Sequence, residues 1–316
     1  MCIRDSLGET ITDHIDRVSA LWSRFCAEAE KKPDSWISEA KTAREISSPG
    51  PKNRMISFPY PKLMNSNNAV DMSAAIILCS VEKAKSLGIE KSRWVYPWVG
   101  TEANDTHFVS ERENLHSSPA IRIAGRRAME LARLSPDEID LVDLYSCFPS
   151  AVQIAARELG FPLDRPLTVT GGLTFGGGPL NNYVMHSISR MVSLLRESRA
   201  KKGMITANGG FLTKHSFGIY SASPPVRDFQ YENLQPKVNE MPTRESVTDY
   251  EGPAILESYT VMFASENPDV GHCACLTPEG KRTWANVSDN DVLELMQVEE
   301  FCGRQVFLDG KGTLSF

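Results

Sequence analysis

A glycine-rich segment near the middle of the chain is the first feature whose residues could do chemistry. Gly171-Gly172 is followed, after four residues, by Gly177-Gly178-Pro179, and this loop opens a predicted helix over residues 182–196. His186 lies in the first turns of that helix, where backbone N–H groups and the helix dipole favour an anionic oxygen. We therefore expect His186 to be a candidate site residue; the alternative is a histidine that faces solvent or bonds a carbonyl.

Two other groups of polar residues suggest chemistry but have simpler explanations. His116-Ser117-Ser118 places hydroxyls beside a base, yet adjacency in sequence is not the geometry of a catalytic triad, and Ser118 is well placed to cap a helix. His272-Cys273 and Cys275, with distant Cys302, suggest a metal cluster, but alternate residues of a strand face one side and no second closely spaced pair exists. We predict no metal site.

Strands and helices that alternate from about residue 74 to residue 220 must position the glycine-rich loop. Apolar and β-branched runs predict strands over residues 74–79, 94–99, 139–144 and 203–207, with 217–220 as the hairpin partner of the last. The first of these is expected to be buried on both faces. Helical periodicity predicts helices over residues 11–29, 81–87, 120–134, 149–159 and 182–196. Residues 47–61 have no period and predict a crossing loop, and the alternation as a whole predicts an α/β layered sheet.

The pattern changes after Pro224-Pro225. Short alternating runs such as residues 255–263, with a turn at 277–281, predict a small all-β barrel from about residue 236 onward. At the other end, residues 1–6 fit neither a signal peptide nor the helix that follows. We expect them to be a remnant of gene calling or assembly at the edge of a fragment.

Length and composition narrow the functional classes. The 316 residues allow more than one core, and 41% hydrophobic with 23% charged residues is ordinary globular usage. A formal net charge of −6 with scattered basic residues argues against nucleic-acid binding. No stretch approaches the roughly 20 apolar residues that span a bilayer. Seven cysteines without regular spacing predict reduced thiols in a cytoplasmic protein.

Four segments, in order, carry a resemblance to a known family. Residues 64–75 are similar to the thiolase segment Ala-Asn-Ser-Ser-Gly-x-x-Asp-Gly-Ala-Ala. Tyr145-Ser146-Cys147-Phe148 stands where thiolases have Asn-Glu-Ala-Phe, or His-Asp-Cys-Phe in the sterol-carrier-protein type. The glycine-rich loop matches Gly-Gly, four residues, Gly-His-Pro, and Ala207-Asn208-Gly209-Gly210 matches Cys-x-Gly-Gly. Over roughly residues 64–212 the chain therefore resembles the thiolase superfamily.

The whole pattern, with its extra β domain, most resembles the acetyl-CoA acetyltransferase homologues called thiolase-like protein type 1. The resemblance implies part of a layered αβαβα fold plus an added domain similar to an oligonucleotide/oligosaccharide-binding (OB) barrel. Residues 1–90 would then be the remainder of the N-terminal thiolase half, 91–228 the C-terminal half and 236–316 the OB-like domain. The family's nucleophilic Cys-x-Ser loop is expected upstream of residue 1, and a homodimer is expected to form through that missing half.

The resemblance also implies a site whose usual catalytic residues are replaced. The histidine position holds Gly178 and the cysteine position holds Ala207, and neither can move a proton. Tyr145 would offer a phenol near a thioester, as a hydrogen-bond donor or, with a lowered pKa, as a base; the alternative is a packed tyrosine bonded to backbone. Cys147 matches the cysteine of the variant loop, and the alternative is an inert buried thiol.

The last signature loop supplies the remaining candidates. Asn208 and His215 bracket Gly209-Gly210, which approach the substrate in the family, so the Asn208 amide could polarise a thioester; capping of a turn is the alternative. His186 would replace the missing histidine in space. The residues expected to contact CoA or acyl-CoA are Gly177, Gly178, Gly209, Gly210 and His215.

These expectations lead to one function and two alternatives. The first is a thiolase-like acyl-CoA acyltransferase of lipid metabolism with a degenerate site and acyl-CoA as its ligand. The second is a lyase that cleaves aldol adducts of acyl-CoAs, with Tyr145 as its base. The third is a non-catalytic acyl-CoA binder or scaffold, whose β domain docks a partner or closes the pocket.

Overall fold

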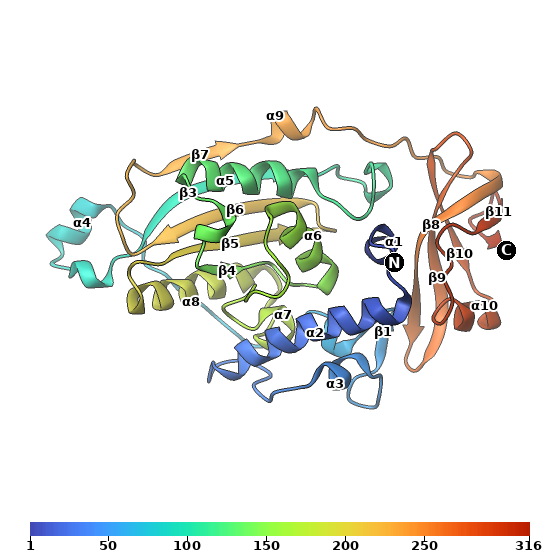
Figure 1. Cartoon of the computed structure of the whole chain (residues 1–316), viewed down its shortest axis with the longest axis horizontal. Helices are drawn as coiled ribbons and strands as arrows, with labels where there is room; N and C mark the ends of the chain where they lie inside the picture. The colour runs from blue at the N-terminus through green and yellow to red at the C-terminus, as the bar shows by residue number, and fades with distance from the viewer.

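A mixed five-stranded sheet forms the centre of the larger part of the molecule, in a computed structural model that describes all 316 residues (Figure 1). Its strand order is β4-β5-β6-β3-β7. The strands are β4 (Leu141–Asp143), β5 (Lys202–Gly209), β6 (Lys214–Ser221), β3 (Tyr96–Asn104) and β7 (Gln230–Asn233). β4 runs parallel to β5 and β7 parallel to β3, whereas β6 is antiparallel to both of its neighbours.

Helices cover both faces of this sheet. Successive residues of β5 point to opposite faces, and each face carries apolar side chains that pack against helices. Met204 belongs to the largest apolar core, and Ile205 packs with Met191 and Leu195 in a smaller one. The first face carries the π-helical turn η4 (Ile121–Gly125) with α5 (Arg126–Ala132), and α6 (Pro149–Leu159) packs against η4. The second face carries α8 (Tyr183–Glu197). The predicted layered α/β architecture is confirmed.

The observed helix boundaries lie close to the predicted ones, because capping residues fix where several helices begin and end. Ser118 Oγ accepts the Ile121 N–H at 3.1 Å, so Ser118 is a capping residue. α6 ends at Gly160, whose φ of 80° suits glycine. α2 (Ile11–Glu30) buries Trp22 and Phe25 in the main core, as its apolar stripe predicts. The shorter helices are α1 (Cys2–Ser6), α3 (Ala43–Ser47), α4 (Val81–Ser86), α7 (Gly172–Phe175) and α9 (Gln235–Val238).

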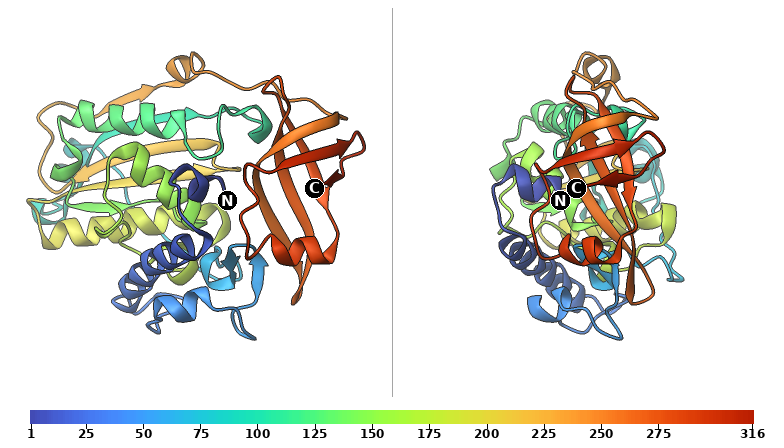
Figure 2. Two further views of the ribbon diagram at one scale, coloured as in Figure 1. Left: turned by 45° about the vertical axis from the view of Figure 1, so that its right-hand side comes forward. Right: turned by 90° about the vertical axis from the view of Figure 1, so that its right-hand side faces the viewer.

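A second sheet forms the predicted all-β unit at the C-terminal end, beside the α/β part (Figure 2). Its strands are β8 (Glu251–Ala264), β9 (Asn267–Leu276), β10 (Arg282–Val287), β11 (Gln305–Asp309) and β12 (Leu314–Ser315), with helix α10 (Asn290–Leu295). β8 pairs with β9 along most of its length and with β11 at its start, and β12 pairs with β11. An isolated bridge from Asn286 of β10 to Thr313 closes the remaining side, so the strands form a small barrel.

Two short strands from the front of the chain extend the barrel sheet, which corrects the prediction that residues 47–61 are only a crossing loop. Ser57 of β1 (Met55–Ser57) pairs with Met262 of β8, and β2 (Tyr60–Pro61) pairs with β1. Phe58 is buried in the barrel core. The proline-rich composition hid this contact, because three strand residues with a distant partner leave no periodic pattern.

The predicted buried strand over residues 74–79 is wrong in this structure. These residues form no strand, and Ile77 is 94% and Leu78 78% exposed. A strand requires a neighbouring strand for its backbone hydrogen bonds, and no strand of this chain runs alongside. The predicted strand 94–99 begins at Tyr96 instead and extends to Asn104. None of the helices is long and apolar enough to cross a lipid bilayer.

Candidate functional site

The C-terminal ends of β4 and β5 bring three of the sequence-predicted residues together. The two strands are parallel and paired up to Asp143 and Ile205, so the chain leaves both at one edge of the sheet. Asn208 Nδ2 lies 3.6 Å from Cys147 Sγ. The backbone N–H of Tyr145 donates to Thr206 Oγ1 at 2.8 Å. Tyr145, Cys147 and Asn208 therefore form one constellation.

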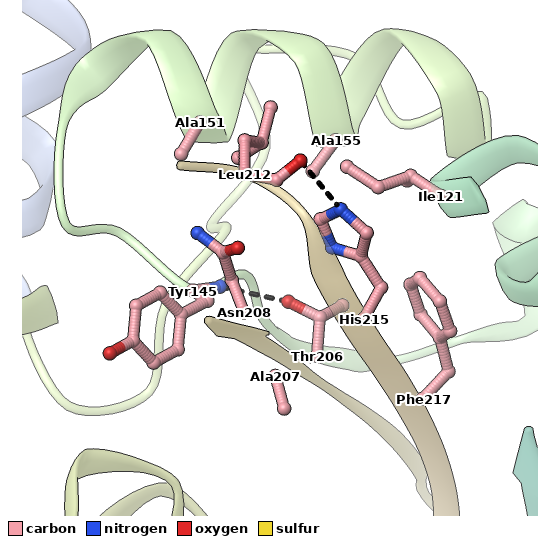
Figure 3. Close-up of a pocket in the computed structure, with 10 residues that line it drawn as sticks. All are labelled: Ile121, Tyr145, Ala151, Ala155, Thr206, Ala207, Asn208, Leu212, His215 and Phe217. Carbon is pink, nitrogen blue, oxygen red and sulfur yellow. Dashed lines mark hydrogen bonds between the residues drawn. The ribbon is translucent and has the colours of Figure 1, made fainter. Parts of the chain in front are cut away.

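A narrow hollow lies beneath these residues, between the sheet and α6 (Figure 3). Thr206 and Asn208 of β5 pair with Phe217 and His215 of β6, so all four side chains face the same side of the sheet. The opposite wall is apolar and comes from α6, η4 and the β5–β6 turn: Ala151, Ala155, Ile121 and Leu212. His215, predicted as a ligand contact, is thus directly beside Asn208.

Tyr145 stands at the rim of the hollow with its ring packed edge-on against Tyr183. The ring centroids are 5.4 Å apart and the planes meet at 83°. Burial, and then the neighbouring Cys147, raise the pKa of the Tyr145 phenol. Its hydroxyl points away from His215 and makes no hydrogen bond within the chain (Figure 3). At neutral pH the group is a phenol able to donate a hydrogen bond, not a phenolate.

Cys147 and Asn208 share a polar contact in apolar surroundings. Burial raises the pKa of the Cys147 thiol to about 11, although the Asn208 amide lowers it slightly. The thiol is therefore protonated at neutral pH. Asn208 Oδ1 is buried and has no hydrogen-bond partner in the chain. An amide with a free buried acceptor is unusual in a folded protein and marks Asn208 as more than a turn cap.

His215 is held by Asp105, an acidic residue that no sequence motif singles out. Its Nε2 lies 3.2 Å from the Leu212 carbonyl and 3.6 Å from Asp105 Oδ2, and both side chains of this pair are almost fully buried. Asp105 also accepts the Ser118 hydroxyl and, at 3.0 Å, the Ala120 N–H. Asp105 follows β3 immediately, and only the fold brings that strand next to β6.

The glycine-rich loop lies to one side of the hollow, against residues 66–72. A Cβ added to Gly178 would stand 2.3 Å from Ser66 Oγ and 3.2 Å from Leu173 Cβ, and one at Gly177 would stand 2.4 Å from Met72 Sδ. The space that a side chain at position 178 requires is thus taken by Ser66. Neither glycine lines the hollow.

His186 is not brought to the constellation. It lies half-buried on α8, with Nε2 3.5 Å from Asn182 Nδ2, and burial, followed by the charge of Lys32, lowers its pKa. It does not line the hollow. Its helical neighbour Tyr183 does reach the site, because that ring packs against Tyr145.

A second, open groove of about 300 Å³ borders the same loop. Asn208 and His215 line both this groove and the hollow, whereas Gly209 lines the groove but not the hollow. Its other residues are mostly polar and come from β3, β5, β6 and β7: Glu102, Ala103, Asn104, Ala207, Lys214, Ser216 and Asn233. Gly210, with φ of 65°, shapes the turn that follows.

A buried carboxylate organises the loops behind Tyr145. Asp143 is fully buried, and Oδ1 accepts the Tyr183 hydroxyl at 2.9 Å and the Ser187 hydroxyl at 2.7 Å. Oδ2 accepts the Thr168 hydroxyl at 3.0 Å and the Val169 N–H at 2.9 Å. Thr168 Oγ1 in turn accepts the N–H groups of Gly171 and Gly172. Asp143 thereby fixes the glycine-rich loop and α8 against the end of β4.

The cysteines and histidine of the barrel lie apart from this site. Cys273 and Cys275 are buried in the barrel core, and His272 faces outward with Nδ1 2.8 Å from Asn286 Oδ1. All seven cysteines are free thiols. No three His, Cys, Asp or Glu side chains are grouped so that they could hold a metal ion.

Comparison with known proteins matches both parts of the chain. The family "Thiolase C-terminal domain-like" matches residues 101–164, and "Thiolase-like protein type 1 additional C-terminal domain" matches residues 233–313. A monomeric SCP2-thiolase-like protein type 1 from Mycobacterium smegmatis superposes with a TM-score of 0.87 at 28% identity, over 99% of this chain and 70% of that one.

The chain belongs to the thiolase superfamily.

Curated relatives in this superfamily are shorter matches. An acetyl-CoA acetyltransferase from Methanocaldococcus jannaschii is 29% identical over 126 residues, which is 35% of this chain and 32% of the relative. One from Methanothermobacter thermautotrophicus is 26% identical over 192 residues, or 55% and 49%. The chain therefore matches half or less of the length of these two enzymes.

The residues of the site can be compared with those expected from the thiolase signatures. Gly178 and Ala207, expected from the resemblance to stand at the histidine and cysteine positions, carry no titratable atom. The two segments expected to correspond to the Asn-Glu-Ala-Phe and Cys-x-Gly-Gly signatures lie together through Tyr145, Cys147 and Asn208. Tyr145 and Asn208 offer hydrogen-bond donors, a phenol and an amide N–H, whereas the His215 imidazole has its Nε2 beside the Leu212 carbonyl and Asp105.

Proposed function

We propose that the protein is a thiolase-like acyl-CoA acyltransferase homologue of lipid metabolism, with a C-terminal half whose acid–base groups have been lost. The observation that carries the proposal is the meeting of Tyr145, Cys147 and Asn208 at the ends of β4 and β5, next to Ala207. The loops that frame a thiolase site are kept, while its proton-transferring side chains are absent. CoA or an acyl-CoA is the proposed ligand.

The remaining side chains suit polarisation of a thioester better than proton removal. A protonated Tyr145 and the Asn208 amide can both donate to a carbonyl oxygen, and such donors stabilise the oxyanion that forms when a thioester is attacked or enolised. Removal of an α-proton requires a base, and the Cys147 thiol, with a pKa of about 11, is not one at neutral pH. We therefore expect acyl-CoA binding with slow turnover.

A non-catalytic acyl-CoA binder is the second candidate, favoured because the imidazole that lines the hollow, that of His215, has its Nε2 engaged by the Leu212 carbonyl and Asp105. The lyase alternative, by contrast, needs Tyr145 as a phenolate, and the burial that raises its pKa works against that role. The free cysteines support a place in the cytoplasm. The M. smegmatis relative is described as monomeric, which weighs against the homodimer expected from thiolases in general.

The test uses the purified protein expressed from its complete gene. Acetyl-CoA binding is measured by calorimetry, and thiolysis of acetoacetyl-CoA with CoA is followed by mass spectrometry. We expect stoichiometric binding and a slow turnover that falls about 100-fold in Tyr145→Phe, because one oxyanion donor is lost. Tyr231→Phe, at an exposed tyrosine on β7, is the matched control. Binding without any turnover would support the binder, and no CoA binding would contradict both candidates.

A further inference from the structure

A single arginine of the barrel reaches out of it into the α/β part. Arg282, on β10, is fully buried, and its Nε and Nη2 pair with both carboxylate oxygens of Glu257 at 2.6 and 2.7 Å. Its remaining donors leave the barrel: Nη1 donates to the carbonyls of Ser110, at 3.0 Å, and of Arg112. Nη2 also lies 3.4 Å from the Glu113 carbonyl. The loop over residues 109–113 is thus held by the barrel.

The segment that enters the barrel reinforces this attachment. The Arg244 N–H donates to the Glu111 carbonyl at 2.8 Å, and its Nε donates to that of Glu113 at 3.0 Å. Arg244 Nη1 bonds the Gly280 carbonyl at 2.6 Å, and the Arg282 N–H donates to the Glu245 carbonyl at 2.8 Å. The loop, the entering segment and β10 therefore form one hydrogen-bonded unit.

The other side of the same loop holds the turn of the β5–β6 hairpin. Arg112 Nη2 donates to Thr213 Oγ1 at 3.0 Å, and the Asp105 N–H donates to the Thr213 carbonyl at 2.8 Å. Thr213 lies two residues before His215, and Asp105 is the carboxylate beside His215 Nε2. His215 pairs with Asn208 across the hairpin. The hydrogen bonds of Arg112 and Asp105 therefore connect the 109–113 loop to the candidate site.

We infer that the C-terminal barrel positions the β5–β6 hairpin, and with it Asn208 and His215, through the hydrogen bonds that Arg282 makes to the 109–113 loop. Stabilisation of the barrel alone does not account for Arg282, because a buried ion pair contributes little compared with apolar side chains of similar size. Apolar residues at these positions could not make the hydrogen bonds that Arg282 makes to the 109–113 loop. Arg282 is on this view a positioning residue, with Arg112 as the next link.

The main test replaces the pair as a unit, so that no lone charge is left buried. Arg282→Met combined with Glu257→Met keeps the barrel core apolar and removes every hydrogen bond that the Arg282 side chain makes to the loop, while those of Arg244 remain. Hydrogen exchange is read at the amides of Asp105 and Thr213, both of which donate within the tethered region. We expect at least 10-fold faster exchange at these two amides, with unchanged protection along β9 inside the barrel.

The control and a second variant keep the outcome decisive. Arg304→Gln removes a barrel arginine whose side chain pairs with Glu299 and stacks on Phe301, both in the barrel, so the Asp105 and Thr213 amides should not change. Arg112→Gln breaks the next link without altering the barrel, and should speed exchange at Thr213 to a similar extent. Adding it to the double replacement should give little further change, because the links act in series. Exchange within twofold of the unaltered protein would overturn the inference.

A ligand-binding measurement tests whether the attachment of the hairpin to the barrel matters for the proposed function. This part of the inference rests on the proposed function. The double replacement should weaken acetyl-CoA binding about 5-fold or more, while Arg304→Gln leaves it unchanged. If the unaltered protein binds no acetyl-CoA, the proposed function fails, and the exchange experiment still decides the role of the barrel. If exchange accelerates but affinity does not change, the hairpin is held by the barrel without serving the ligand, and the functional part of the inference is wrong.

Discussion

The side-chain amide nitrogen of Asn208, near the end of β5, lies 3.6 Å from the sulfur of Cys147, in the loop after β4 and 61 residues away in sequence. β4 and β5 are parallel neighbours, so the contact reports whether the ends of the two strands keep their relative position. It also joins a thiol that is held in its protonated form to an amide whose buried carbonyl oxygen has no hydrogen-bond partner.

Cys147 should be a slow nucleophile. Its pKa of about 11 means that the thiolate fraction, and with it the alkylation rate, rises steeply only in strongly alkaline solution. Mass-spectrometric measurement of iodoacetamide labelling against pH should give a midpoint near 11 for Cys147. Asn208→Leu should shift that midpoint upward, because it removes a hydrogen bond that favours the thiolate. Exposed Cys79 is the internal control, and a Cys147 midpoint below pH 8 would show an activated thiol instead.

Ser66 and Gly178 should behave as a coupled pair. Gly178→Ala should lower the free energy of unfolding by about 1–3 kcal/mol, because the new Cβ would stand 2.3 Å from Ser66 Oγ. In a Ser66→Ala background most of that loss should disappear, giving a coupling of about 1 kcal/mol or more in chemical denaturation. Gly50→Ala, where nothing lies within 4 Å of the added Cβ, is the control. Additive effects would contradict the close contact, and a histidine at position 178 should likewise need a small residue at 66.

Asp143→Asn should destabilise the protein by about 2–3 kcal/mol, because five surrounding groups donate hydrogen bonds to this carboxylate and the new amide would present a donor to some of them. The loss should be seen in urea unfolding together with faster exchange at the Gly171 and Gly172 amides. Exposed Asp269→Asn is the matched control. Unchanged exchange at the two glycines would mean that the loop does not depend on Asp143.

Stability should fall as the pH drops below about 6.5, with His14 as a contributor. Burial lowers the pKa of His14 to about 4, so the unfolded chain binds this proton more readily than the folded chain between these two values. Protonation therefore favours unfolding across that window, by up to about 3 kcal/mol from this residue. Urea unfolding at pH 7 and pH 4.5 measures the loss.

The contribution of His14 is isolated by substitution. His116 and His186, whose pKa values burial also lowers, act in the same direction, so some pH dependence should remain in His14→Gln. The difference in stability between the two pH values should nevertheless shrink. An equal pH dependence in the unaltered protein and in His14→Gln would contradict the buried neutral imidazole.

Local patterns predicted the helices well because capping and periodicity are short-range properties. Ser118 before its helix and Gly160 after another were assigned from residue type alone, and the structure confirms both. The order of signature loops also predicted the superfamily. The strand over residues 74–79 failed for a physical reason: an apolar run shows that a segment can be buried, but only a neighbouring strand can make it a strand.

The candidate site could be predicted in part, because some of its residues lie in recognisable motifs and others do not. Tyr145, Cys147 and Asn208 lie in loops with recognisable residues, and these loops do meet. Asp105 and Thr206 were missed because their importance comes from tertiary neighbours: Asp105 has no motif around it, and Thr206 is an ordinary strand residue until its hydroxyl accepts the Tyr145 N–H. His186 was placed correctly on its helix, but its position around the helix turned it away from the hollow.

The short strand β1 changes how the C-terminal barrel can be regarded in evolution. Phe58, nearly two hundred residues upstream of the barrel strands, fills part of the barrel core, and its N–H donates to the Val261 carbonyl at 2.8 Å. A gene fragment that encodes only residues 233–313, the extent of the recognised domain, would lack this piece of its interior. Such a fragment is a poor candidate for recombination onto unrelated proteins, because it would arrive with an uncovered edge. Substitutions at Phe58 and in the barrel core around it are therefore subject to one shared packing constraint.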